Sequence, residues 1–387
     1  MDRRHFIRLV GGGTIAAAAL PLAGCSADYP PQAVEAWAGP GDEPDTGRWA
    51  LAHAILAPSS HNLQPWLVDL RTPQSLTLFV DRERLLPETD PWFRQIMVSQ
   101  GAFIETLLLA LAERGAVAQV SLFPDGEPGA RTLDDRPVAR ITWAPGSPPR
   151  DPLFAQIRRR HTAKVGYDSS RPVAAATLQA LGAAVAREPT VRFGGTVQPE
   201  ALPALRTLCF EAGRVETATP RTALESLRLT RIGPDEIARH RDGISLNRAF
   251  PRVMSAVGLF DRSVAPAPGS AGFDAMLKFY REQSDTAMGF AWLSTPVVAG
   301  ATRRAEVAAG RAWMRLQLKA TELGLQTQPM SQAPQEFAEM KPWHDELHRL
   351  TVGRPAGEEV VQMFARLGYA AAQPNTPRRP LQGFVRA

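Results

Sequence analysis

The sequence has few groups that could carry out covalent catalysis or bind a metal ion. Only two of its 387 residues are cysteines and seven are histidines. It contains no C-x-x-C pair and no G-x-S-x-G turn, the patterns typical of thiol redox, zinc and serine-nucleophile sites. His344 and His348 stand four residues apart, but the D-E-L between them differs from the zinc-protease motif H-E-x-x-H. We therefore predict no metal site, and the two histidines are interpreted as packing at the edge of the core.

The sequence also lacks a strong net charge and the cysteines for a disulfide framework. The formal charge is +5 and falls to +3 without residues 1–24, because three arginines and one aspartate lie there. That charge is too small to indicate nucleic-acid binding. We expect Cys25 to carry a lipid. Only the Cys209 thiol then remains, so no internal disulfide can form. Stability must come from the core, and a hydrophobic content of 44% is ordinary for a globular protein.

The apolar run at the N-terminus is too short to span a membrane, and the N-terminus has the pattern of an export signal. Residues 2–8 read D-R-R-H-F-I-R and precede a short apolar run from Leu9 to Leu20. The paired arginines resemble the twin-arginine signal, whose pathway carries folded proteins. L-A-G-C at 22–25 is similar to a bacterial lipobox with lipidation of Cys25; the alternative is a plain cleavable signal with an incidental cysteine. We expect a periplasmic, membrane-anchored lipoprotein, with any cofactor inserted in the cytoplasm before export.

The length exceeds a single typical core, which favours two domains or a duplicated unit. Residues 101–115 and 310–324 each begin and end with glycine and have leucine and alanine at matching offsets. Two helices with glycine caps can look alike by chance; the sharper interpretation is a duplicated α+β unit. We predict a signal at 1–25, a linker at 26–48, a first half at 49–150, and a second half at 151–387 with a lid insertion at 233–275.

Hydrophobic periodicity predicts the helices and strands of both halves. The expected helices are 49–56, 96–114, a helix carrying 157–164, 178–186, 202–231 with interruptions, 279–292, 310–323, 343–350 and 357–365. The expected strands are 67–70, 76–80, 117–123, 138–143, 191–197 and a buried strand at 296–299.

Two polar stretches are the candidate binding elements. Residues 57–66 read A-P-S-S-H-N-L-Q-P-W, and the prolines make this loop stiff, so that its polar side chains point in set directions. Such a loop suits a flat ligand with polar edges; the plainer alternative is a capped turn before a strand. Residues 158–164 read R-R-R-H-T-A-K and offer charge and donors to a phosphate, or else form a solvated face.

Taken together, these stretches resemble the nitroreductase family of FMN-binding oxidoreductases. Residues 58–66 match that family's loop P-S-S-x-N-x-Q-P-W at every fixed position, and 160–164 fit its phosphate motif. Residues 324–332 fit loosely the turn after its long helix, and the tail around 368–381 has the family's Gly-Tyr followed by Arg-x-Pro-Leu. The loop precedes the phosphate motif here, whereas ordinary members have the opposite order. The run from Asp90 to Ala102 is similar to the Acg-like branch, in which one chain forms a pseudo-dimer.

The resemblance implies an α+β, nitroreductase-like fold of duplicated units in an intramolecular pseudo-dimer, acting as a monomer with one FMN. Ser59, Ser60, Asn62 and Gln64 would contact the flavin, with Trp66 packing beneath them. Arg160, His161, Thr162 and Lys164 would hold the phosphate, together with Arg378 or Arg379. Pro329, Met330, Ser331 and Gln332 would lie near flavin N5, although Met330 alone is interpreted as packing.

The expected function is an exported FMN-dependent oxidoreductase that passes electrons to a nitro, quinone or similar acceptor. The donor would be NAD(P)H, a quinol or a redox partner, and the only other partners expected are the twin-arginine export machinery and the membrane. The alternative is a flavoprotein that sequesters FMN with little or no turnover, with the 233–275 segment folded over the flavin.

Overall fold

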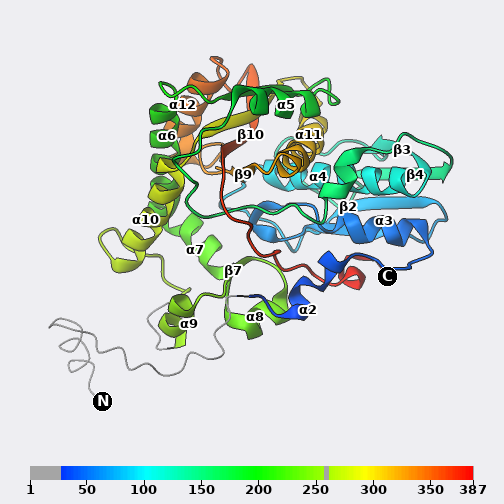
Figure 1. Cartoon of the computed structure of the whole chain (residues 1–387), viewed down its shortest axis with the longest axis horizontal. Coiled ribbons are helices and arrows are strands. Elements are labelled where there is room, and N and C mark those ends of the chain that lie inside the picture. The colour runs from blue at the N-terminus through cyan, green and yellow to red at the C-terminus, as the bar shows by residue number, and fades with distance from the viewer. Residues whose placement is uncertain (1–27, 257–260, 387) are drawn as a thin grey trace.

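The computed structural model describes residues 28–256 and 261–386 (Figure 1). The predicted twin-arginine signal, the lipobox and Cys25 therefore lie outside the described residues. The only long apolar helix among the described residues that could span a membrane by length and composition is α4 (Arg94–Glu113), and it is largely buried, as the core helix of a soluble protein is. Cys209 is a free, buried thiol, and burial raises the pKa of that thiol well above its usual value.

The chain contains two units with the same order of elements. The first unit comprises α3 (Thr46–Ala54), β1 (Trp66–Asp69), β2 (Ser75–Val80), α4 (Arg94–Glu113), β3 (Ala116–Leu122) and β4 (Ala139–Pro145). The second comprises α5 (Ala175–Val185), β5 (Arg192–Thr196), β8 (Gly289–Pro296), α11 (Thr302–Glu322), β9 (Gln326–Pro329) and β10 (Glu359–Gly368). Both sheets are antiparallel and have corresponding strand orders, β1-β2-β4-β3 and β5-β8-β10-β9. Each unit is thus helix, two strands, long helix, two strands.

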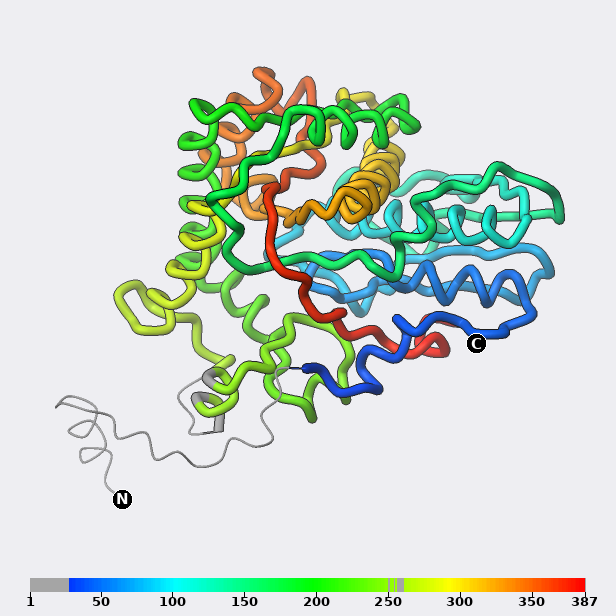
Figure 2. The backbone as a smooth tube through the Cα atoms, in the orientation of Figure 1, coloured from blue at the N-terminus to red at the C-terminus, as the bar shows by residue number. Residues whose placement is uncertain are grey.

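The second unit carries a large insertion where the first has a short turn. It contains α6 (Leu202–Ala218), α7 (Pro220–Arg228), β6 (Thr230–Ile232), α8 (Gly233–His240), β7 (Ile244–Leu246), α9 (Ala249–Ala256) and α10 (Ala271–Asp285). Strands β6 and β7 form a separate parallel pair. Figures 1 and 2 show α6 and α10 flanking the second sheet, while α7, α8 and α9 lie below the body, beside the start of the described chain.

The two units meet where α4 crosses α11, and a glycine of each helix makes the close approach possible. A Cβ added to Gly101 would lie 2.0 Å from the carbonyl oxygen of Val307, and one added to Gly310 would lie 2.0 Å from that of Val98. These are the first glycines of the two repeated segments, and their contacts are reciprocal. The last glycines, Gly115 and Gly324, have φ of +70° and +67° and follow the helix ends, as glycine caps do. The predicted repeat is therefore a structural one.

Several predicted elements differ from the structure. Residues 289–292, predicted as helix, open strand β8, while 297–298 are exposed beyond its end rather than part of a buried strand. Residues 357–365, predicted as a short helix, belong mostly to β10. Both strands lie in the middle of their sheet and are buried on both faces, so their sequences lack the alternation of a half-exposed strand.

Two further segments differ at the boundary of the second half and at the start of the chain. The predicted helix through 157–164 does not form. The short 3₁₀ helix η3 (Pro152–Gln156) ends just before these residues, and their backbone is irregular. The predicted linker at 26–48 contains α2 (Pro31–Val34), η1 (Glu35–Ala38) and the first turn of α3. Ala33 and Trp37 are buried there, so from residue 28 onward the segment packs against the body.

Candidate functional site

The loop at residues 58–66 joins α3 to β1 and has a strained backbone. His61, Asn62 and Gln64 have φ of +48°, +54° and +54°, a region that non-glycine residues rarely occupy. Side chains hold this conformation: the Gln64 N–H donates to Ser59 Oγ at 2.9 Å, and Ser60 Oγ donates to Gln95 Oε1 at 3.0 Å. Clustered strain of this kind is most often found at functional sites.

The amides of this loop bind the C-terminal tail rather than pointing freely outward. Asn62 Nδ2 donates to the Pro377 carbonyl at 3.0 Å, and Asn62 Oδ1 accepts from Arg378 Nη1 at 2.7 Å. Gln64 is fully buried; its Nε2 donates to two backbone carbonyls and its Oε1 accepts from the Arg379 N–H at 2.8 Å. Both donors of Gln64 are thus used within the protein, and its role is to support the loop. Trp66 is buried beneath the loop, as predicted.

Arg160 and Arg378 form a pair of buried guanidinium groups next to the loop. They are 3% and 2% exposed, and each donates from Nη2 to the Leu56 carbonyl, at 2.9 and 3.1 Å. The Nε of each has no hydrogen-bond partner among the described residues. Burial lowers the pKa of Arg160 to about 10, and burial followed by the charge of Arg160 lowers the pKa of Arg378 well below its ordinary value. All their hydrogen-bond partners are neutral, so the pair leaves a positive charge that a bound anion could compensate.

The adjacent Arg379 is a different case. Its guanidinium lies 3.4 Å from the Asp81 carboxylate and also donates to the carbonyls of Gln64 and Gly383. Of the two tail arginines, only Arg378 therefore keeps an uncompensated charge beside Arg160.

The rest of the predicted phosphate motif lies along an irregular segment after Arg160. His161 Nδ1 lies 3.2 Å from the Arg159 carbonyl while its buried Nε2 has no partner, and Thr162 is half-buried. Lys164 is exposed, and the surrounding protein lowers the pKa of its ammonium. Burial, and then the charge of Lys164, lower the pKa of His61 to about 4, which links the phosphate motif to the loop.

Residues 329–332 follow β9 and approach the site through a buried polar network that the sequence did not indicate. Gln332 Nε2 lies 3.4 Å from the Tyr280 hydroxyl, which donates to Glu216 Oε1 at 2.9 Å. Burial raises the pKa of Glu216, and the charge of Glu216 offsets part of the lowering that burial causes in the pKa of Lys164. Met330, in contrast, is 2% exposed within the core, so its side chain packs inward, while Pro329 is paired with β10 and Ser331 is half-buried.

The insertion in the second unit also contacts the loop at residues 58–66. The Gly243 N–H donates to the Asn62 carbonyl at 3.4 Å, and the Arg241 carbonyl accepts from Gln64 Nε2 at 2.9 Å. His61 Nε2 lies 3.0 Å from Ser226 Oγ on α7. Two segments of the insertion, α7 and the connection between α8 and β7, therefore contact the loop directly, and the second of them lies within the predicted lid at 233–275.

His344 and His348 lie on α12 (Lys341–Thr351) and pack together, with ring centroids 4.4 Å apart. His348 Nδ1 donates to the His344 carbonyl at 2.8 Å, and His348 Nε2 accepts from the Val361 N–H at 3.1 Å. Among the described residues no group of three or more His, Cys, Asp or Glu could hold a metal ion. The pair holds α12 against β10.

This arrangement predicts acid sensitivity, because both rings must be neutral in the folded protein. Burial, and then His348, lower the pKa of His344 to about 3, and burial lowers the pKa of His348. The unfolded chain binds these protons near pH 6.5 while the folded protein does not, so the free energy of unfolding should fall as pH drops from about 6.5 toward 4. Urea unfolding at pH 7 and pH 5 measures the loss. His344→Gln should flatten this pH dependence, and an equal slope in the variant would contradict the assignment.

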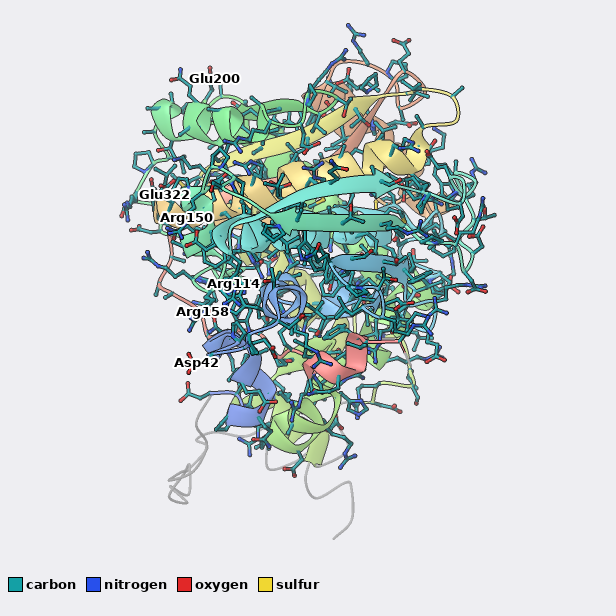
Figure 3. The ribbon with its side chains drawn as sticks, turned by 90° about the vertical axis from the view of Figure 1, so that its right-hand side faces the viewer. Asp42, Arg114, Arg150, Arg158, Glu200 and Glu322 are labelled. Atoms are coloured by element: carbon teal, nitrogen blue, oxygen red, sulfur yellow. The ribbon has the colours of Figure 1, made fainter. Side chains whose placement is uncertain are left out.

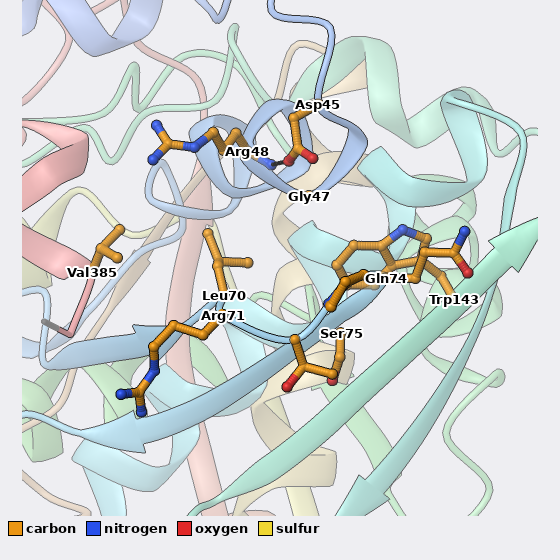
Figure 4. Close-up of a pocket in the computed structure, with 11 residues that line it drawn as sticks. Asp45, Gly47, Arg48, Leu70, Arg71, Gln74, Ser75, Trp143 and Val385 are labelled. Atoms are coloured by element: carbon orange, nitrogen blue, oxygen red, sulfur yellow. Dashed lines mark hydrogen bonds between the residues drawn. The ribbon is translucent and has the colours of Figure 1, made fainter.

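A separate surface cavity of about 240 Å³ lies between the start of α3 and the β1–β2 turn. Figure 4 shows its lining, with Asp45, Trp143 and the tail residue Val385 around it. It contains none of the predicted site residues. Figure 3 shows charged side chains such as Arg158 and Glu322 on the surface of that side of the molecule, in contrast to the buried Arg160.

Comparisons with known proteins found full-length relatives, whereas no family model matches the chain. Putative NAD(P)H nitroreductase Rv3131 of Mycobacterium tuberculosis is 29% identical over 355 residues, which cover 88% of this chain and 91% of the relative. A second protein of that organism, putative NAD(P)H nitroreductase acg, is 35% identical over 81 residues, which cover 21% of this chain and 24% of the relative.

Among solved structures, a putative nitroreductase from Anabaena variabilis has a TM-score of 0.42 and 11% identity, covering 88% of this chain and 91% of the other. A nitroreductase with bound FMN from Bacteroides fragilis has a TM-score of 0.35 and 16% identity, covering 59% and 94%. The repeated α+β units are seen directly in the structure, and the similarity to nitroreductases extends over most of the chain. The predicted α+β fold of duplicated units is confirmed.

Proposed function

We propose that this chain is an FMN-dependent oxidoreductase of the nitroreductase family, of its Acg-like single-chain branch. The observation that carries the proposal is the buried pair Arg160 and Arg378, which has no carboxylate partner in the described part of the chain and lies beside the strained loop. The unpartnered Nε atoms of the two arginines and Nε2 of His161 fit a phosphate monoester, which offers several strong acceptor oxygens.

In this proposal the two units divide the task of holding FMN. Arg160, Thr162 and Lys164 of the segment before α5 and Arg378 of the tail hold the phosphate. The backbone of residues 59–62 and the segment at 329–332 line the ring system. When bound, FMN supplies hydride or electron transfer between a donor and an acceptor. The protein fixes the orientation of the cofactor, and the insertion limits the access of water and of other molecules to it.

The names of the full-length relatives make NAD(P)H the first donor to test. We also propose that residues 1–25 direct twin-arginine export and lipidation of Cys25, which would place the protein in the periplasm. There a membrane quinol or a redox partner would replace the nicotinamide as donor, and the acceptor would be a nitro compound, a quinone or a similar small molecule.

Cells that express the full chain test the proposal directly. We expect the solubilised membrane fraction to yield protein with flavin absorbance, and acid-released cofactor to run as FMN on chromatography. Because the phosphate clamp is preformed, apoprotein should take FMN back in preference to riboflavin. Colourless protein that does not bind added FMN would contradict the proposal.

A second candidate function is FMN sequestration with little turnover. The specific observation in its favour is the set of bonds from Arg241, Gly243 and Ser226 to the loop, which closes one side of the site. Photoreduction of the bound flavin followed by addition of a nitroarene or a quinone distinguishes the two. Rapid reoxidation under anaerobic conditions supports the enzyme, whereas flavin that stays reduced with every acceptor supports sequestration.

A further inference from the structure

The first described segment of the chain contacts the arginine pair. Helix α2 and the 3₁₀ helix η1 lie beside the C-terminal tail and α8 (Figures 1 and 2). The Ala33 carbonyl accepts from the Arg378 N–H at 2.8 Å, and Glu35 forms an ion pair with Arg241 at 2.7 Å. Ala33 is fully buried and Trp37 is 5% exposed. The segment is thus built into the protein at the side of the site where the positive charge is concentrated.

Trp37 touches both halves of the arginine pair. The guanidinium carbons of Arg160 and Arg378 lie 5.8 and 5.0 Å from the centre of its ring. Its indole N–H donates to the Thr376 carbonyl at 2.8 Å, and Thr376 Oγ1 accepts from Arg378 Nη1 at 2.7 Å. The Trp37 carbonyl accepts from Arg158 Nε at 3.0 Å. One residue therefore connects the segment that precedes Arg160 with the tail that carries Arg378.

The choice of an aromatic partner matters for the charge of the site. A carboxylate would hold the two arginines but would also cancel their charge, and an anionic ligand would then gain little from them. An aromatic ring attracts a guanidinium through its quadrupole and carries no net charge. Together with neutral acceptors such as the Leu56 carbonyl, Trp37 orders the pair and leaves its positive charge for a ligand.

We propose that Trp37 is a positioning residue of a phosphate clamp, holding Arg160 and Arg378 side by side with their charge uncancelled. The binding site would then have three parts, with the N-terminal segment added to the two units. The inference rests on the proposed function, because it concerns the phosphate end of the same cofactor.

Affinity for FMN relative to riboflavin tests this role, because the two flavins differ only in the phosphate. We expect Trp37→Leu in the full-length protein to weaken FMN binding about tenfold, from the loss of cation–π contacts to two desolvated guanidinium groups. Riboflavin binding should change by less than about twofold on the same reasoning. Fluorescence titration of the apoprotein with each flavin measures both constants.

Two variants control for structure. Trp37→Phe keeps a ring against the guanidinium groups and should retain most of the preference for FMN. Trp92→Leu removes a comparable contact elsewhere, since Arg131 lies 4.0 Å from the centre of the Trp92 ring and Trp92 is 37% exposed. That variant should leave the ratio of the two affinities unchanged. If Trp37→Leu does not fold, Trp37→Met carries the same expectation with a longer apolar side chain.

The outcomes separate this inference from the proposed function. Wild-type protein that binds FMN, with a preference for FMN over riboflavin that Trp37→Leu leaves intact, overturns the inference alone. Equal losses for FMN and riboflavin would make Trp37 a merely structural residue and also overturn it. Wild-type protein that binds neither flavin overturns the proposed function and this inference with it. A selective loss for FMN, restored by Trp37→Phe, supports both.

Discussion

Replacing Arg160 with methionine is expected to stabilise the apoprotein and to weaken FMN binding at the same time. Arg160 is 3% exposed, and within residues 28–256 and 261–386 it has no carboxylate partner and no acceptor for its Nε. The lowering of its pKa from 12.5 to about 10 corresponds to about 3 kcal/mol of unfavourable burial. Replacing buried charges by apolar side chains of similar volume often stabilises a protein by about 1–4 kcal/mol. We expect the apoprotein to gain about 1–3 kcal/mol on that basis.

The same substitution should remove a large part of the affinity for FMN. A charge-assisted hydrogen bond contributes about 1.5–3 kcal/mol, so its loss corresponds to about a 10- to 150-fold increase in the dissociation constant. Flavin binding in solution and urea unfolding of the apoprotein measure the two effects independently. Their opposite signs identify a charge that is kept for a ligand and not for the fold.

Arg159→Met is the matched control, because Arg159 is adjacent in sequence but exposed. It should change neither the flavin affinity nor the free energy of unfolding by more than about 0.5 kcal/mol. If Arg160→Met destabilises the apoprotein and leaves FMN binding unchanged, the arginine pair serves to stabilise the fold. In that case the phosphate assignment would fail.

The sequence was most informative where local chemistry dictates the contact. The loop at 58–66 was predictable because its prolines and small polar residues restrict the backbone strongly, and the repeat because a pair of glycines recurs at the same spacing in both long-helix segments. The pairing of Asn62 with Arg378 spans more than 300 residues, and only the family resemblance brought those two residues to one site. The choice of Arg378 over Arg379 required the structure, because it depends on Asp81 standing next to Arg379 alone.

Other features could not be read from the sequence because they depend on tertiary burial. The residues of β10 have no period-two pattern, since this strand lies between β8 and β9 and is covered on both faces. Glu216 and Tyr280 are separated by 64 residues and meet only through the packing of α6 on α10. Trp37 lies in a stretch rich in proline, glycine and acidic residues, a composition typical of a linker. The Trp37 side chain is what packs that stretch against the arginine pair.

Substituting Gly101 or Gly310 with alanine is expected to cost about 3 kcal/mol or more, and the two losses should be similar. An added methyl group would meet a backbone carbonyl at 2.0 Å in either case, and backbone atoms of a helix cannot turn aside as a flexible side chain can. The two helices would have to separate, which would loosen the contacts of Val307, Met314 and Leu318 with the first core. Denaturant unfolding measures the loss for each variant. Gly272→Ala is the control, because its methyl group would meet only Pro266 Cβ at 3.6 Å within helix α10, so it should be neutral or stabilising by about 0.5 kcal/mol.

The double substitution distinguishes a shared crossing point from two separate sites. Because a Cβ on Gly101 would lie 2.9 Å from the Cα of Gly310, and the reverse is also true, both methyl groups push apart the same pair of backbones. Once the first substitution has separated the helices, the second should cost less, so the double variant should be more stable than the sum of the single losses predicts. Additive losses would mean that each helix end adjusts independently. Sub-additive losses would show that the two repeated units pack against each other at a single crossing point. This contact brings the loop of the first unit and the Arg160 segment to a common site.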